Sequence, residues 1–179
     1  MSLGKFPTFF VLLGIAALSA AVFGALHNQL SYAVGPDYFH KIKFPQFGIP
    51  ADISPRLGAA LVGAQASWWM GALVGLPAFA LGLFSVPNAR SYLAAGIGAI
   101  GLVIVLATSA ALAGLIGGLI ADTTGLLDQA LSLPDGVARS DFLRAGFMHD
   151  AAYVAGALGA LLAIWPMRRA RAVDLRRAG

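Results

Sequence analysis

The side chains best suited to chemistry in this sequence are two histidines, His27 and His149, which lie far apart along the chain. An imidazole can bind haem iron, copper or zinc, and it can exchange a proton near neutral pH. Counting about 20 residues forward from Pro7, one bilayer crossing, places His27 at the end of a first apolar stretch. The same count back from Trp165 places His149 about one helical turn inside the same boundary. The sequence therefore predicts two imidazoles at one depth, which we expect to approach one another.

Other polar side chains fall at a similar level and extend this candidate site. The full set of candidate ligand-binding residues is His27, Gln29, Gln65, His149, Asp150 and Tyr153. His27 and His149 are the candidate metal ligands, since two histidines on different helices could bind a haem or, with a nearby Asp, a metal ion. Three interpretations stay open: a hydrogen-bonding network between helices, a bound haem or metal, and a pocket for a small molecule such as a quinone. No cofactor follows from the sequence alone.

The composition decides what kind of element must position these side chains. Of 179 residues, 59% are hydrophobic and 11% are charged, and the mean hydropathy is +0.80. Soluble domains carry about 25% charged residues. This deficit excludes a soluble enzyme, a DNA-binding domain and a disordered chain. Without cysteine, the chain cannot form disulfides, Cys-ligated zinc sites or iron–sulfur clusters.

Four apolar stretches are long enough to cross a bilayer as helices, which takes about 20 residues each. They cover residues 6–27, 57–84, 93–121 and 147–165. We expect the first to be a retained span, although Lys5 and the small residues near Ala25 resemble a secretory signal. The prediction is an all-α integral membrane four-helix up-down bundle, forming a single transmembrane domain over residues 1–179 with a small extracytoplasmic cap. The cap would comprise the outer loops 30–54 and 122–144, and residues 167–179 would form a basic cytoplasmic tail.

Charge sets the expected orientation. Five arginines follow the last stretch and only Asp174 opposes them. Cytoplasmic segments of membrane proteins carry an excess of Lys and Arg. We therefore expect the protein in a bacterial inner membrane with both termini on the cytoplasmic side. Stripes of small residues, such as Gly63, Ser67, Gly71 and Gly75, predict close helix packing, since lipid gives no hydrophobic drive for association.

The first outer loop alternates aromatic and basic residues. The residues expected to contact lipid or a partner protein are Tyr38, Phe39, Lys41, Lys43, Phe44 and Phe47. The predicted topology keeps this loop away from nucleic acid.

The segment His27 to Phe47, with its His-Asn-Gln start and its Lys-Ile-Lys-Phe-Pro-Gln-Phe end, resembles a segment of uncharacterised bacterial four-helix inner-membrane proteins. The sequence Met148-His-Asp-Ala-Ala-Tyr153 resembles their last helix. The resemblance implies that these positions recur in such proteins: His27, Gln29, Tyr32, Lys41, Lys43, Gln46, His149 and Tyr153. It brings no activity with it.

The sequence favours a non-enzymatic function. The middle of each stretch contains no Asp, Lys or Arg, the chain contains no Glu, and no catalytic motif is present. The leading hypothesis is an accessory or assembly subunit, or a self-associating bundle, whose partners are membrane lipids and further membrane subunits or copies. The alternative is a haem-, metal- or quinone-binding redox module that uses His27 and His149 at the outer boundary.

Overall fold

The computed structural model describes residues 4–127, 130–133 and 135–178, and all regular structure in those ranges is helical. The long helices are α1 (Lys5–Val34), α4 (Pro55–Ser85), α5 (Ala89–Thr124) and α6 (Arg139–Leu162). After Ala163 the chain continues as α7 (Ile164–Ala178). Three short elements lie between α1 and α4: α2 (Pro36–Tyr38), the π-helical turn η1 (Phe39–Lys43) and α3 (Phe44–Phe47). The prediction of an all-α protein is confirmed.

Four helical segments of the described chain are long and apolar enough to cross a membrane, with α6 and α7 counted as one. The helices extend beyond the apolar stretches predicted from sequence. α1 continues to Val34, α5 reaches Thr124 and α6 already begins at Arg139. The connections are therefore shorter than the predicted loops, because backbone hydrogen bonding can continue through polar residues that end a hydropathy window.

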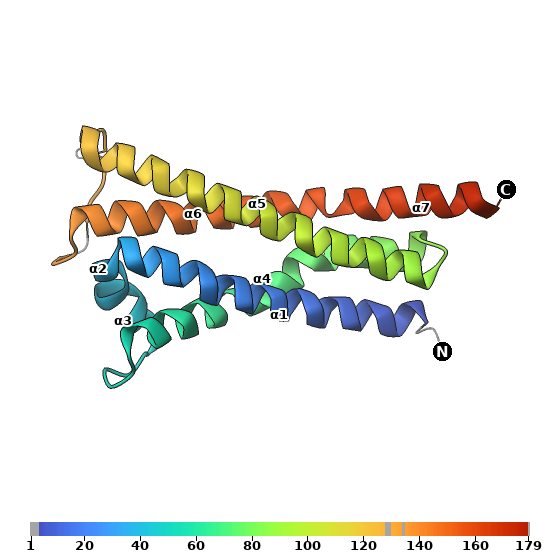
Figure 1. Cartoon of the computed structure of the whole chain (residues 1–179), viewed down its shortest axis with the longest axis horizontal. Helices are drawn as coiled ribbons and strands as arrows, with labels where there is room; N and C mark the ends of the chain where they lie inside the picture. Colours follow the sequence, from blue (N-terminus) through green and yellow to red (C-terminus); the bar gives the residue numbers. More distant parts are fainter. Residues whose placement is uncertain (1–3, 128–129, 134, 179) are drawn as a thin grey trace.

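Successive long helices run in opposite directions, and both termini lie at the same end of the molecule (Figure 1). The most extensive helix contacts join α1 to α4 and α5 to α6. Contact between α1 and α6 is smaller, so the bundle consists of two closely packed helix pairs that meet along its length.

Within each pair the backbones touch at glycines. A Cβ atom at Gly24 of α1 would overlap the Gly63 carbonyl of α4, and a Cβ atom at Gly63 would overlap Gly24 in turn. In the other pair, a Cβ atom at Gly114 of α5 would overlap the Phe147 carbonyl of α6. Such contacts bring helices together through packing alone, as association in lipid requires.

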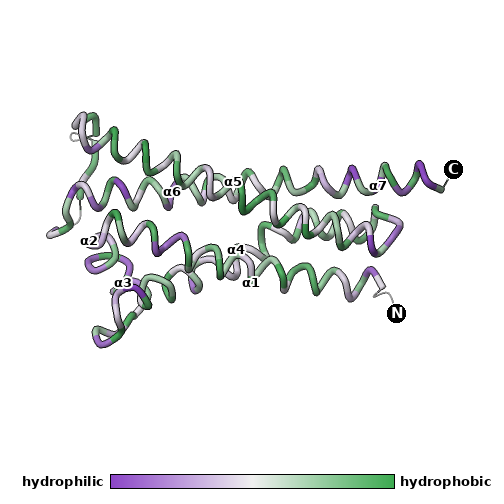
Figure 2. The backbone as a smooth tube through the Cα atoms, in the orientation of Figure 1, coloured by the Kyte–Doolittle hydropathy of each residue, from purple (hydrophilic) through white to green (hydrophobic). Residues whose placement is uncertain are grey.

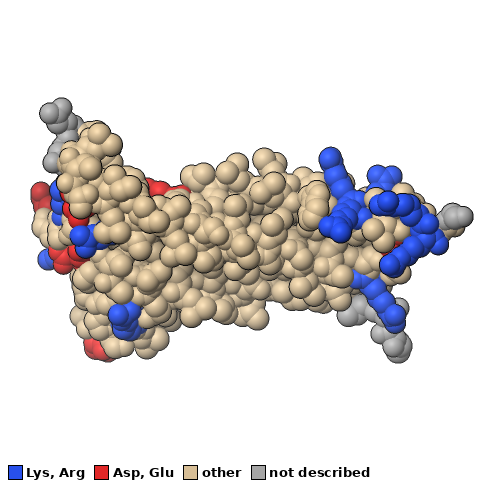
Figure 3. Space-filling model, turned by 45° about the horizontal axis from the view of Figure 1, so that its top comes forward, with Lys and Arg blue, Asp and Glu red and all other residues tan. Residues whose placement is uncertain are grey.

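The two ends of the molecule differ in polarity. Apolar residues dominate the middle of the long helices, and polar residues gather toward both ends (Figure 2). At the end with the termini, called here the basic end, Lys and Arg side chains cluster, whereas acidic and basic side chains mix at the opposite end (Figure 3). Asp174 of α7 accepts hydrogen bonds from the Ser91 hydroxyl at 2.7 Å and the Asn88 amide at 3.1 Å, which fixes α7 to the start of α5.

We predict that Gly114→Ala destabilises the protein by about 1–3 kcal/mol, since the added methyl group would overlap the Phe147 backbone. Gly117→Ala is the matched control, because a Cβ atom there makes an ordinary contact of 3.4 Å with the Phe147 ring. The control should be neutral or gain up to about 1 kcal/mol from helix propensity. Thermal unfolding in detergent measures both, and equal midpoints for the two variants would contradict the backbone contact.

Candidate functional site

His27 of α1 and His149 of α6 meet where the two helix pairs adjoin. Their ring centroids are 4.8 Å apart and the rings are nearly perpendicular, at 84°. His149 is only 6% exposed, and His27 is half-buried. The prediction that these two imidazoles approach one another is confirmed.

The Nε2 atoms of both imidazoles are buried, and neither has a hydrogen-bond partner among the described residues. A buried polar group without a partner costs about 1–3 kcal/mol of stability. Buried polar side chains are normally paired with protein or with ordered water. The pair therefore offers two hydrogen-bonding atoms that the protein's own side chains do not use.

Aromatic rings enclose the pair. Tyr38 stacks on His149 with centroids 5.4 Å apart, and Phe39 and Tyr153 lie 6.0 Å and 6.3 Å from the same imidazole. Phe23 stacks on His27 at 5.7 Å. The surroundings of the two imidazoles are thus largely apolar, and flat rings lie on several sides of them.

Two of these rings come from the segment of residues 36–47, which forms α2, η1 and α3 and is called here the cap segment. Tyr38 is 8% exposed and Phe39 is fully buried. The prediction that Tyr38 and Phe39 contact lipid or a partner is therefore wrong. The helical turns of the cap segment direct both rings onto His149. Removing the rings from water there is favourable, since burial of apolar surface stabilises the fold.

The cap segment is fastened to the start of α6 by two hydrogen bonds. The Asp37 amide donates to Asp141 Oδ2 at 2.8 Å, and the Ala138 amide donates to Asp37 Oδ2 at 3.2 Å. The chain also passes close to α6 at Gly35, where a Cβ atom would overlap the Asp141 carbonyl. These contacts with α6 hold Tyr38 and Phe39 over His149, which lies on α6.

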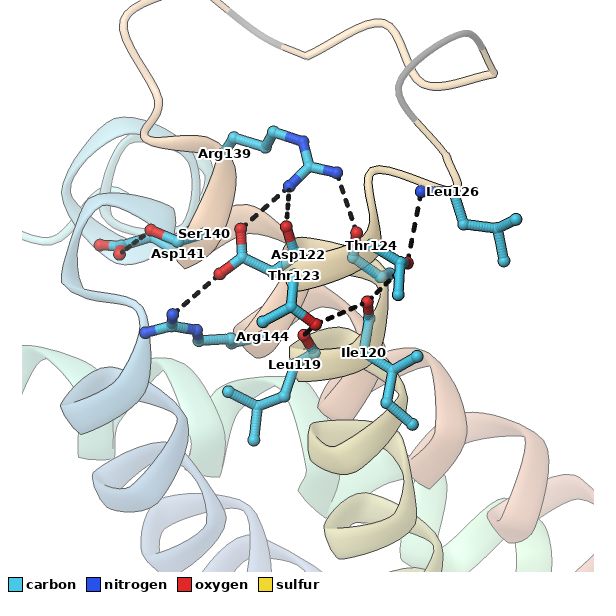
Figure 4. A network of polar contacts seen from close by, with 11 residues as sticks. Leu119, Ile120, Asp122, Thr123, Thr124, Leu126, Arg139, Ser140, Asp141 and Arg144 are labelled. Carbon is cyan, nitrogen blue, oxygen red and sulfur yellow. Dashed lines mark hydrogen bonds and ion pairs between the residues drawn. The ribbon is translucent and has the colours of Figure 1, made fainter.

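The start of α6 is fixed to the end of α5 by an ionic cluster (Figure 4). Asp122 accepts from Arg139 Nη1 at 2.9 Å through Oδ1 and from Arg144 Nη2 at 2.8 Å through Oδ2. Arg139 also donates to the carbonyl oxygens of Ala121 and Asp122, each at 2.9 Å. Two arginines on one carboxylate set the position of α6 and, through it, of His149.

Asn28 and Gln29 hold α1 to the beginning of α4. Asn28, 2% exposed, donates to the Ala59 carbonyl at 3.0 Å. The Gln29 side-chain amide donates to the Arg56 backbone carbonyl at 3.0 Å. The Arg56 guanidinium donates back to the Gln29 backbone carbonyl at 2.7 Å. Gln29, predicted as a ligand-binding residue, makes structural contacts here.

The remaining predicted site residues are more exposed than the two histidines. Tyr153 borders the imidazoles but is 41% exposed. Asp150 and Gln65 are exposed. Of the residues predicted to contact lipid or a partner, Lys41 is exposed, and Lys43, Phe44 and Phe47 are half-buried.

Lys43 brings a cation to the site from the cap segment. Its Nζ lies 5.3 Å from the centre of the Tyr38 ring and donates to Gln46 Oε1 at 3.2 Å. Burial lowers the pKa of Lys43, and the negative charge of Asp150 acts in the opposite direction. Burial also raises the pKa of the Tyr38 hydroxyl, so that it stays neutral.

Ser31, a buried polar residue of α1, is not among the residues predicted from the sequence. It is fully buried, and its hydroxyl lacks a partner among the described residues. Its position four residues after His27 in a continuous helix is the signal that could have placed both residues on one face.

Two neighbouring cavities lie in the bundle, and the smaller one contacts the histidine pair. A small one of about 30 Å³ is lined by His27, His149, Lys43 and Tyr153 among others. A larger cavity of about 110 Å³ lies deeper in the bundle and has an almost wholly apolar lining. Phe23, Ser67, Ala152 and Tyr153 line both cavities.

The ligand set is not that of a typical metal or haem site. Among the described residues, no three His, Cys, Asp or Glu side chains gather to hold a metal ion, whereas zinc sites use three or four protein ligands. Axial ligation of a haem with metal–nitrogen bonds of about 2 Å requires imidazole centroids about 6 Å apart. The observed 4.8 Å is too short for an iron and a porphyrin plane between these rings.

No protein-family model, curated protein sequence or solved structure matches the chain.

We predict that Tyr38→Ala exposes His149 to diethyl pyrocarbonate, which carbethoxylates accessible imidazoles. Removing the ring opens the covering over His149, so modification of the His149 peptide, read by mass spectrometry, should accelerate several-fold. Tyr38→Phe keeps the ring and should leave the rate unchanged. Equal rates for all three proteins would show that Tyr38 does not shield His149.

Proposed function

We propose that this chain is a membrane-embedded binding protein for a neutral, lipid-soluble molecule of the quinone class, whose head lies at His27 and His149. The observation that carries the proposal is the pair of buried Nε2 atoms without partners, at the meeting point of two helix pairs. Ligand sites are typically apolar with a few convergent polar groups. The arrangement around these imidazoles has that character, and binding would widen the cavity of about 30 Å³ beside them to admit the ring.

The charge balance supports a neutral head. Lys43 is the cation that lines the small cavity, and Asp150 is the nearby carboxylate that opposes it electrostatically. A neutral imidazole donates a hydrogen bond from one ring nitrogen and accepts at the other. A quinone carries two carbonyl acceptors on a flat ring, so it suits imidazole donors and the stacking faces of Tyr38 and Phe23.

A purely structural network of the kind expected from sequence would require partners that the described side chains do not supply. Ordered water could satisfy the nitrogens, because a cavity of about 30 Å³ can hold water. The two occupants can be distinguished by experiment, because only the binding of a quinone would depend on both imidazoles. Binding of this kind also suits an accessory subunit of a larger membrane complex, the role that the sequence favours.

We further propose that the chain forms a four-helix up-down bundle in a bacterial inner membrane, with the basic end in the cytoplasm. Supporting this orientation, Lys5, Arg90 and the five arginines of α7 belong to the basic end. The cap segment and the histidine pair then lie toward the outer face of the membrane.

The head site predicts that 2-methyl-1,4-naphthoquinone, which has no tail, binds the purified protein in detergent. His149→Leu or His27→Leu should weaken binding about tenfold, the effect of losing one hydrogen bond of about 1.4 kcal/mol. His40→Leu is the matched control, since His40 is exposed and its imidazole hydrogen-bonds to the Tyr32 hydroxyl at 3.0 Å, away from the histidine pair. Equilibrium dialysis measures the affinities, and an equal loss in all three variants would contradict the assignment.

The orientation predicts opposite labelling of two single-cysteine variants, which need no background removal because the chain has no cysteine. In intact cells, a membrane-impermeant maleimide should modify Asp52→Cys, in the connection before α4. It should leave Ala172→Cys in α7 unmodified until the cells are opened. The reverse pattern would overturn the proposed topology.

A further inference from the structure

A groove runs over the surface between α1 and α5 and passes His27 of the histidine pair. Its volume is about 620 Å³, within the range of about 300–1,000 Å³ typical of small-molecule sites. It is lined by Leu18, Ser19, Val22, Leu26, His27 and Thr108, among others. The apolar residues Leu18, Val22 and Leu26 are more than half exposed, on the part of α1 that is expected in lipid.

The polar side chains that line the groove are Ser19, His27 and Thr108, among mostly apolar neighbours. Thr108 bonds to the Ile104 carbonyl of its own helix at 2.8 Å, so its hydroxyl is already satisfied. His27 differs, because its Nε2 atom is buried and has no partner among the described residues. His27 also lines the small cavity that contains His149, which makes the groove and the head site adjoin at this imidazole.

Access from the aqueous side is closed by the cap segment. Tyr38 and Phe39 are buried over His149, and their segment is bonded to the start of α6. The inner cavity of about 110 Å³ has neither histidine in its lining. Of the groove and the two cavities, the groove combines the largest volume with an opening to lipid.

From these observations we infer that the α1–α5 groove binds a linear hydrocarbon tail of the same molecule whose head contacts His27 and His149. This inference rests on the proposed function and specifies it. The molecule is a tailed amphiphile, a quinone with an isoprenoid chain, and it enters sideways from the bilayer. Ordinary phospholipid acyl chains are the competing occupant of the groove.

A substitution that fills the groove tests this inference. Thr108 lines the groove and is exposed, so Thr108→Phe places a ring where the tail would lie. Ser109→Phe is the matched control, because Ser109 is the next residue of α5, is also exposed and is not part of the groove lining. Both proteins are placed in phosphatidylcholine nanodiscs together with the unsubstituted protein.

The two probes are 2-methyl-1,4-naphthoquinone and the same ring bearing a four-unit prenyl tail, with affinities expressed per mole of lipid. Thr108→Phe should weaken binding of the tailed quinone about tenfold and leave the tail-less quinone unchanged, while Ser109→Phe should change neither. If both quinones bind the unsubstituted protein and Thr108→Phe leaves the tailed one unaffected, the groove inference fails and the head site stands. If Thr108→Phe weakens both quinones equally, the tail assignment also fails. If neither quinone binds the unsubstituted protein, the proposed function fails together with the inference.

Discussion

Direct backbone contact between helices is the constraint on which the rest of the structure depends. Gly24 and Gly63 allow α1 and α4 to touch, and Gly114 allows α5 to reach the Phe147 carbonyl of α6. His27 follows Gly24 by three residues, and His149 follows Phe147 by two. The contacts that set each helix pair are thus within one helical turn of the two imidazoles. A larger residue at Gly24, Gly63 or Gly114 would push the paired helices apart and move an imidazole with them.

The histidine pair shows how such rigidity can serve binding. A flexible site would let each Nε2 atom turn toward a backbone carbonyl or toward water. Here the stacked rings of Tyr38 and Phe23 hold the imidazoles, and neither Nε2 atom reaches a partner among the described residues. Groups kept in this state lower the stability of the free protein, and a molecule that pairs with them regains that free energy. Natural proteins commonly accept such a loss of stability at functional sites.

The long apolar helices and the meeting of the histidines could be predicted, because hydropathy and the rise of a helix fix depth along the chain. Depth does not fix rotation about the helix axis, so Gln65 shares the predicted level and yet is exposed. The burial of Tyr38 and Phe39 could not be predicted either, since it depends on the long-range bonds of Asp37 to Asp141 and Ala138. The groove between α1 and α5 likewise exists only once both helices are packed.

The central claim is that the imidazole of His149 is kept for binding and does not stabilise the free protein. The most direct test is the unfolding free energy of His149→Leu in detergent, without any added quinone. Leucine removes the buried Nε2 atom at similar volume and keeps apolar contact with the surrounding rings, so the relief of about 1–3 kcal/mol should offset the loss of imidazole stacking, which is worth about 0.5–1.5 kcal/mol for a ring pair. We therefore predict that the His149→Leu protein is at least as stable as the original. A loss of more than about 1 kcal/mol would show that His149 is part of a structural network and would contradict the account.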